Sequence, residues 1–292
     1  MEKKEKIGIV ADEGGDLPRY FVEKYQVSIV PFKVDFGEMK NLKGNIYQKI
    51  KEAEKRGLSP FAKTSQPSVG DFLKAFKEKL RKFEKVICIT ITSKHSGTFN
   101  SALFAKNLLG ENFKEKVHVI DSLSGSGGEG LIILKAASLI KREFSLEKIL
   151  EKLRESVKRT SLIFILKNPK WLKSSGRIPP ILVKILEKFQ KIGIIPFLGI
   201  KKGKIRFLGI KKGKNDIATF LFKEFLNRIS RLKEEKIIKV AITHADNLKE
   251  AKKLKEMIEK IKNCKICFVN LIGEVLGTIA GPGALALSWQ YD

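Results

Sequence analysis

The stretch SVGDFLKAFKEKLRKFEKVICITI, residues 68–91, joins a helical pattern to a strand pattern. Ser68 is suited to cap a helix, with Asp71 three residues on, and Phe72, Phe76 and Leu80 recur at helical spacing. This predicts a helix over residues 68–82. The apolar run at 86–91 then predicts a strand.

The same alternation extends over the first half of the chain. The sequence predicts further strands at residues 7–11, 28–36 and 117–120, and helices at 17–25, 45–56, 101–109 and 131–141. Strands that alternate with helices are typical of a mostly parallel sheet covered by helices. Residues 1–160 are therefore expected to form a Rossmann-like α/β domain.

The second half continues as α/β but contains an internal repeat. LGIKKGK at residues 198–204 recurs at 208–214, and two apolar strands hinged at Gly203 indicate an antiparallel hairpin. The other predicted strands are 162–166, 237–243 and 265–270, the last one in the chain. The predicted helices are 146–158, a turn at 169–174, 180–190, 216–232 and 247–261, the last capped at Asn247 with Glu250. Residues 161–292 are expected to form a second α/β domain with a mixed sheet.

Length and composition favour a folded protein of two domains: the chain has 292 residues, 43% of them hydrophobic. Met1 is not followed by a long apolar stretch, and Glu274 with Gly281-Pro282-Gly283 interrupts the apolar region at 271–289. We therefore expect no signal peptide and no insertion into a membrane. The chain has 3 cysteines, too few for a disulfide framework, which points to a reducing cytoplasm.

The formal net charge of +26 raises the question of nucleic-acid binding. Lysines are spread over nearly every predicted helix and interleaved with glutamates, as on solvated helix faces. Aromatic residues do not alternate with the basic runs, as a platform for stacked bases would need. We expect no specific nucleic-acid binding, and nonspecific association through charge stays open.

A glycine motif leaves a nucleotide site as an alternative. Gly125, Gly127 and Gly130 fit G-x-G-x-x-G between a strand that ends at Asp121 and a helix. However, that strand is not the first of its sheet, and no acidic residue ends the following strand to hold a ribose. The glycines equally fit a turn that passes close to another segment. A nucleotide-dependent enzyme using residues 125–130 is thus the alternative function.

Other reactive residue types do not form a recognisable catalytic or metal motif. Cys264 and Cys267 make a lone C-x-x-C, for which buried thiols are the simpler interpretation. His95 and His244 each follow a predicted strand, where α/β sheets place ligands. His118 alternates with apolar residues inside a predicted strand, which is typical of a half-buried side chain. We therefore predict no catalytic residues, no metal and no cofactor.

Two segments crowded with hydroxyls follow breaks in the apolar pattern: Thr64-Ser65-Gln66-Pro67-Ser68 and the stretch SKHSGTFN at residues 93–100. Hydroxyls in loops can donate hydrogen bonds to an acid group without carrying charge. Arg177, in the turn at residues 174–179, is either an exposed turn residue or an arginine poised for a phosphate or carboxylate.

Taken in order, these segments resemble the DegV family of bacterial fatty-acid-binding proteins. The resemblance runs nearly end to end and rests on Asp12 with Asp16-Leu17-Pro18, T-S-Q-P-S at 64–68, S-G-T-F-N-S-A at 96–102, Asp121-Ser122 with the glycine run, S-G-R-I at 175–178 and Gly281-Pro282-Gly283. It implies two α/β domains with a long-chain fatty acid, such as palmitate, in a buried tunnel between them.

The resemblance also implies roles for individual residues. Thr64 and Ser96 would bind the fatty-acid carboxylate, and further candidates at that site are Ser65, Gly97, Thr98 and Ile279. Some members of the family carry the acid for a separate ATP-binding kinase subunit. Arg206 is at the position equivalent to an arginine that is implicated in docking the kinase subunit in these members. Arg177 is a second candidate for contact with a phosphate or with the kinase subunit. The expected protein is a cytoplasmic lipid carrier that catalyses no reaction of its own.

The sequence departs from the family at two places. Glu13-Gly14-Gly15 follows the first aspartate, where Ser or Thr is usual, and Ile279 stands where many members have a histidine near the carboxylate. The second change bears on transfer of phosphate to the ligand more than on binding, because Thr64 and Ser96 are present.

Overall fold

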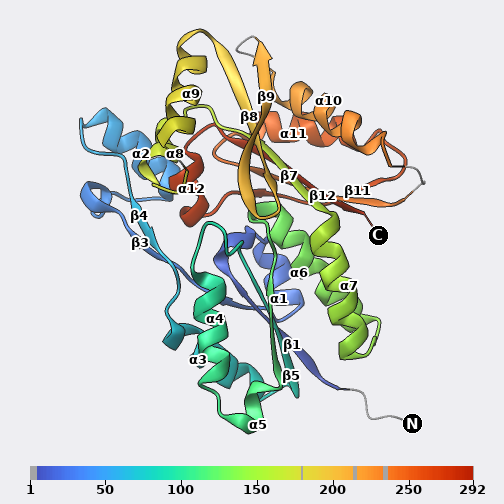
Figure 1. Cartoon of the computed structure of the whole chain (residues 1–292). Helices are drawn as coiled ribbons and strands as arrows, with labels where there is room; N and C mark the ends of the chain where they lie inside the picture. The colour runs from blue at the N-terminus through green and yellow to red at the C-terminus, as the bar shows by residue number, and fades with distance from the viewer. Residues whose placement is uncertain (1–4, 179, 213–215, 233–235, 292) are drawn as a thin grey trace.

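The computed structural model describes residues 5–178, 180–212, 216–232 and 236–291. Two α/β domains lie one above the other, the first in the lower half of Figure 1 and the second in the upper half. The first sheet is parallel, in the order β2-β1-β5-β6. Its strands are β1 (Ile7–Asp12), β2 (Ser28–Val30), β5 (Lys85–Thr90) and β6 (Val117–Asp121). The Rossmann-like domain predicted from the alternation is confirmed.

Helices cover both faces of this parallel sheet. On one face α3 (Val69–Leu80) and α4 (Thr98–Asn107) pack against Val10, Val86 and Cys88. On the other, α6 (Ser126–Lys141) and α7 (Leu146–Arg159) pack against Ile9, Ile87 and Ile89. Alternate residues of each strand are thus buried on opposite faces, which explains the continuous apolar runs. A short helix, α1 (Arg19–Lys24), joins β1 to β2, and α5 (Glu111–Lys114) precedes β6.

The second sheet is mixed, in the order β11-β10-β12-β7-β8-β9. Its strands are β7 (Thr160–Ile165), β8 (Ile194–Lys201), β9 (Lys204–Lys212), β10 (Ile238–His244), β11 (Cys264–Leu271) and β12 (Leu285–Tyr291). Only the β10–β11 pair is parallel. Helices α10 (Ile217–Ile229) and α11 (Leu248–Ile258) cover one face. The hairpin hinged at Gly203 is confirmed as β8–β9, although Gly213 and Lys214 of the repeat lie outside the described residues.

Helix α6 lies between the two sheets and packs on both (Figure 1). A Cβ at Gly127 would lie 3.0 Å from the Cβ of Ala241 in β10, and one at Gly130 would lie 2.7 Å from the Gly15 carbonyl. The glycines therefore allow a close approach, which offsets their low helix propensity. The prediction that this helix begins at residue 131 was wrong, because the glycine run forms its first turns.

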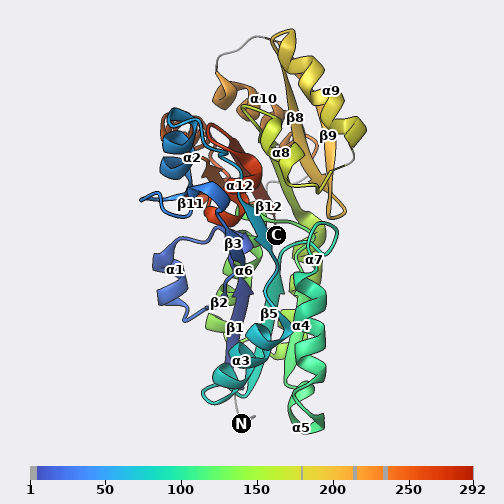
Figure 2. The same cartoon turned by 90° about the vertical axis from the view of Figure 1, so that its left-hand side faces the viewer.

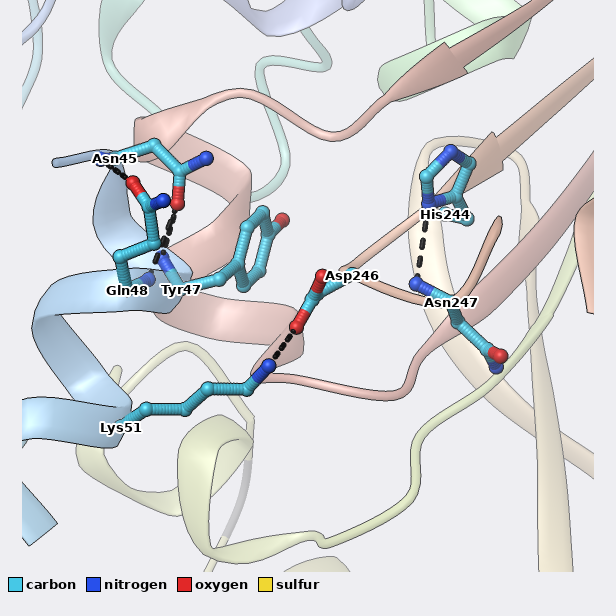
Figure 3. Close-up of polar contacts among 7 residues, drawn as sticks. All are labelled: Asn45, Tyr47, Gln48, Lys51, His244, Asp246 and Asn247. Carbon is cyan, nitrogen blue, oxygen red and sulfur yellow. Dashed lines mark hydrogen bonds and ion pairs between the residues drawn. The ribbon is translucent and has the colours of Figure 1, made fainter. Parts of the chain in front are cut away.

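Part of the N-terminal half crosses over to pack on the second domain (Figure 2). This part includes the two-stranded sheet of β3 (Lys33–Asp35) and β4 (Lys63–Ser65) and the helix α2 (Ile46–Lys55). Tyr47 donates a hydrogen bond from Oη to the Ile272 carbonyl at 2.8 Å. Lys51 forms an ion pair with Asp246 at 2.5 Å (Figure 3). The limits of the two domains, 1–160 and 161–292, stay a prediction.

Several predicted elements need correction. The extended segment at 28–36 is two strands separated near Phe32, and residues 63–65 form a strand where a loop was expected. The strand at 265–270 is not the last: α12 (Glu274–Ala280) and β12 follow it, and β12 lies between β10 and β7.

The predicted cap of α11 is also wrong. The Asn247 amide donates to the Gly283 carbonyl at 2.9 Å, and Glu250 accepts from the backbone of Ala218. By contrast, the capping box formed by Ser68 and Asp71 is confirmed. Asn45 and Gln48 form another at the start of α2 (Figure 3). The remaining short helices are α8 (Lys170–Ser174) and α9 (Pro180–Lys191).

Candidate functional site

A cavity of about 870 Å³, counting the part open to solvent, lies between the two domains. The second domain supplies one wall: Leu162 and Phe164 of β7, Ile200 of β8 and Ala286 of β12. These residues face the cavity because strand side chains alternate, while Ile163, Ile165, Leu285 and Leu287 pack under α10 and α11.

Helix α12 and the first domain complete the cavity. Val275, Leu276, Ile279 and Ala280 come from α12, and Phe32 and Ile91 follow strands of the first domain. Most of the lining is therefore aliphatic or aromatic, so the cavity suits an apolar chain.

One end of the cavity is polar. Thr92, His95, Ser96 and Arg177 line it, and we call these four residues the polar end. The first three follow β5, at the carboxyl end of a parallel strand, where open α/β sheets bind ligands. Ser96 and Arg177 are half-buried, so the polar end reaches solvent.

Thr64 is held against the polar end by Arg177. The guanidinium Nη2 donates to Thr64 Oγ1 at 2.7 Å, across a sequence separation of 113 residues. Thr64 is the half-buried middle residue of β4, and its neighbours Lys63 and Ser65 are exposed on the other face. Thus a hydroxyl from the first half of the chain and a cation from the second meet beside the cavity.

Ser96 lies just before the N-terminus of α4. Its Oγ is 2.7 Å from Oγ1 of Thr98, the first helical residue. The first N–H groups of a helix lack partners within the helix and carry partial positive charge, so this position favours an anion. Gln66 connects the first hydroxyl segment to α4, because its Nε2 donates to Ser101 Oγ at 3.0 Å.

The electrostatics of the polar end are cationic. Burial lowers the pKa of Arg177 from its ordinary value, yet an arginine remains charged at neutral pH. Burial, together with the nearby charges of Arg177 and Lys204, lowers the pKa of His95. An acid group placed here would receive hydrogen bonds from neutral hydroxyls and from one cation. Arg177, which the sequence left as an exposed turn residue or a cation for a phosphate or carboxylate, is half-buried at the polar end.

The remaining predicted residues lie in different places. Ile279 lines the cavity, whereas Ser65 is exposed and turned away. Gly97 packs against the Gln66 amide, and Thr98 is buried beneath Ser96. Arg206 is exposed on β9, one residue from the cavity-lining Ile205, and does not line the cavity.

Sequence reasoning missed Ser124 and Ser126, which line the cavity beside Gly125. Ser126 Oγ donates to the buried Asp16 at 2.6 Å and is 2.8 Å from Thr243 Oγ1. Burial raises the pKa of both Asp12 and Asp16 to about 7. Burial beside them raises the pKa of Glu129 well above its ordinary value. A cluster of buried carboxyls thus lies behind this wall, and the small residues around it gave no sequence signal beyond the glycine run.

The other reactive side chains lie away from the polar end. His118 is half-buried on β6, as predicted, and His244 accepts a hydrogen bond at Nδ1 from the backbone of Asn247 (Figure 3). Cys264 and Cys267 are partly buried free thiols whose pKa is raised by burial. Among the described residues, no group of three His, Cys, Asp or Glu side chains is placed to hold a metal ion. Within the same ranges, no helix is long and apolar enough to cross a membrane.

A family model matches residues 6–292, nearly the whole chain, and its description is "Uncharacterised protein, DegV family". The chain belongs to the DegV family. A DegV domain-containing protein of Halalkalibacterium halodurans is 30% identical to it over 98% of this chain and 99% of the relative.

Two other similar proteins carry names that bear on the cavity. A fatty acid-binding protein of Thermotoga maritima is 29% identical over 96% of each chain. A solved structure from the same organism, described as revealing fatty acid binding function, aligns with a TM-score of 0.79 at 26% identity. That alignment covers 99% of this chain and 100% of the other. These names describe binding, and neither names a reaction.

Proposed function

We propose that this DegV protein binds one long-chain fatty acid in the cavity between its domains. The observation that carries the proposal is one cavity whose lining is mostly aliphatic or aromatic and includes one cation with hydroxyls beside it. This is the pattern that a molecule with one acid group and one hydrocarbon chain requires. The names of the T. maritima relatives support it independently of the cavity.

The carboxylate would lie among Thr64, Ser96 and Arg177. Both hydroxyls can donate to it, and the guanidinium supplies the opposite charge that a half-buried carboxylate needs. The hydrocarbon would run along α12 and β7. A sixteen-carbon chain gains on the order of 10 kcal/mol from transfer out of water, at about 0.8 kcal/mol per methylene, which favours an enclosed apolar cavity.

The direct test is to identify the lipid that the purified protein carries. The protein is denatured and its lipid is extracted into organic solvent. Mass spectrometry then identifies the lipid and measures its amount relative to that of the protein. We expect close to one long-chain fatty acid per chain. If no fatty acid is found, and the delipidated protein takes up no added palmitate, the proposal is wrong.

A role in presenting the acid to a separate ATP-binding kinase subunit is the finer proposal. Arg206 favours it, because this exposed cation lies on β9 beside Ile205, where a partner could reach the polar end. Ile279, in place of the histidine of many relatives, weighs against it. Incubating the loaded protein with a kinase subunit and ATP tests it: an acyl phosphate that forms with wild type but not with Arg206→Ala supports the role, and no acyl phosphate with wild type rejects it.

A further inference from the structure

The tip of the β8–β9 hairpin reaches from the second domain onto the loop that follows β5 in the first (Figure 1). Thr92 Oγ1 donates to the Gly203 carbonyl at 2.9 Å, and Thr92 is buried. Gly203 has a φ of +79°, and a Cβ there would lie 2.7 Å from Thr92 Oγ1. Only glycine permits this close contact, so the hairpin tip is fitted to the first domain.

A second contact joins the same loop to the edge of the sheet. Within the described residues, strand β9 is the last in the order of the second sheet, so the N–H groups on its outer side have no partner strand there. One of them, the N–H of Ile205, donates to Nε2 of His95 at 2.8 Å. The backbone of Arg177 also lies beside the His95 ring and raises the pKa of His95. One imidazole therefore ties β9 to the first domain, next to the Arg177 turn.

Both segments beside His95 contribute to the cavity. The Ile205 side chain lines it, and Arg177 lines it while holding Thr64. If β9 moved away from His95, the part of the apolar wall that Ile205 forms would move with it.

The contact requires neutral His95, because Nε2 accepts only when it carries no proton. The charged groups that face His95 within the described residues are Arg177 from the turn and Lys204 from β9. Partial burial of the ring lowers the pKa of His95 most and both cations lower it further, whereas the backbone of Arg177 raises it. Protonation would place a donor against the Ile205 N–H, which is also a donor.

We propose that His95 is a positioning residue that fastens β9 beside the polar end, so that it controls how fast a bound fatty acid is released. The inference rests on the proposed function for the nature of the ligand. The fastening itself is a property of the protein alone.

Release of a fluorescent long-chain fatty acid into excess albumin tests the inference from pH 8 to pH 5.5. His95→Leu removes the contact to Ile205 and should raise the release rate about two- to tenfold at pH 8, as expected for one lost hydrogen bond. Wild type should show an additional acceleration on acidification. His95→Gln retains an acceptor near the position of Nε2 but does not titrate, so it should release slowly at pH 8 and lack that acceleration.

Two matched variants separate this role from general effects. His118→Gln changes a half-buried histidine on β6, away from the cavity, and should behave as wild type at every pH. Thr92→Val removes the other contact to the hairpin without a titrating group, so it should speed release and keep the acid acceleration. A His95→Leu rate equal to that of wild type at pH 8, or an acid acceleration unchanged in His95→Gln, would overturn the inference.

Hydrogen exchange of the Ile205 amide in the ligand-free protein gives an independent readout. The inference predicts that this amide exchanges several-fold faster in His95→Leu than in wild type or His118→Gln. Equal exchange in the three proteins contradicts the fastening whether or not a ligand binds. Normal protection by His95 in a protein that binds no fatty acid would instead reject only the proposed function.

Discussion

At the scale of single residues, the contact between Arg177 and Thr64 brings a hydroxyl from the first half of the chain beside the polar end. Both residue types were singled out in the sequence, Thr64 through T-S-Q-P-S and Arg177 through its turn. Their distance in the sequence concealed that they meet, because a hydrogen bond across 113 residues depends on how the domains pack. The sequence therefore named both residues, but their contact was not predictable from it.

Removing either hydroxyl should weaken binding of palmitate. Thr64→Val and Ser96→Ala each remove a donor to a carboxylate, and hydrogen bonds to charged groups contribute about 1.5–3 kcal/mol, so we expect about 10- to 100-fold weaker affinity. Ser65→Ala is the matched control, because Ser65 is exposed on the other face of β4. Displacement of a fluorescent fatty acid measures the affinity of each variant for palmitate. Equal affinities in the three variants would exclude these hydroxyls from the site.

The buried Glu129 should make stability depend on pH. Its pKa is raised in the folded protein by burial and by the neighbouring Asp12 and Asp16, so between its ordinary and raised pKa the folded state holds a proton that the unfolded state has lost. The free energy of unfolding therefore falls as pH rises through this window, by up to about 1.4 kcal/mol per pH unit.

Glu129→Gln removes this titration. We expect the variant to gain stability relative to wild type as pH rises from 5 to 8, measured by urea denaturation. The control Glu23→Gln changes an exposed carboxylate paired with Arg19 and should show no such trend. A difference between Glu129→Gln and wild type that stays constant with pH would contradict the assignment.

At the scale of elements, α12 and β12 were not predicted, although they supply much of the cavity. The Gly281-Pro282-Gly283 turn was recognised, but the short helix before it spans only seven residues, Glu274–Ala280. Small and large residues alternate from Ala284, just before β12, into the strand. Ala284 and Ala286 lie toward the cavity, and Leu285 and Leu287 lie toward α10 and α11. That period-two pattern was the available signal, and it was obscured because both faces are apolar.

The turn between α12 and β12 should tolerate no side chain at Gly281. Its φ is +67°, and a Cβ would lie 2.0 Å from Cδ1 of the buried Trp171. Gly57 has nearly the same φ, +70°, but nothing lies within 4 Å of such a Cβ. Gly57→Ala should therefore cost only the backbone strain, about 1–2 kcal/mol.

Gly281→Ala should cost this strain plus the displacement of Trp171, about 3–5 kcal/mol in total. Chemical denaturation of the two variants measures the difference. Equal losses of stability would show that Trp171 does not pack on Gly281 as described.

At the scale of the whole molecule, the two α/β domains followed from the alternation of strands and helices, but their attachment did not. Helix α6 packs on both sheets, and α2 shares a core with Trp171 and Leu172 of the second half. Such long-range packing leaves only weak marks in a sequence, here the glycines that let α6 approach Ala241 and Gly15. The cavity results from this attachment, since both domains contribute its walls.

The central claim, one fatty acid in the cavity between the domains, is tested most directly by calorimetric titration of the delipidated protein with palmitate. Wild type should bind one molecule per chain with a negative heat-capacity change, as burial of an apolar chain requires. Ala286→Phe, which fills the cavity from β12, should abolish this binding while keeping a cooperative unfolding transition, and Ala286→Gly should bind as wild type does. Absence of saturable binding to wild type, or unchanged binding to folded Ala286→Phe, would contradict the claim.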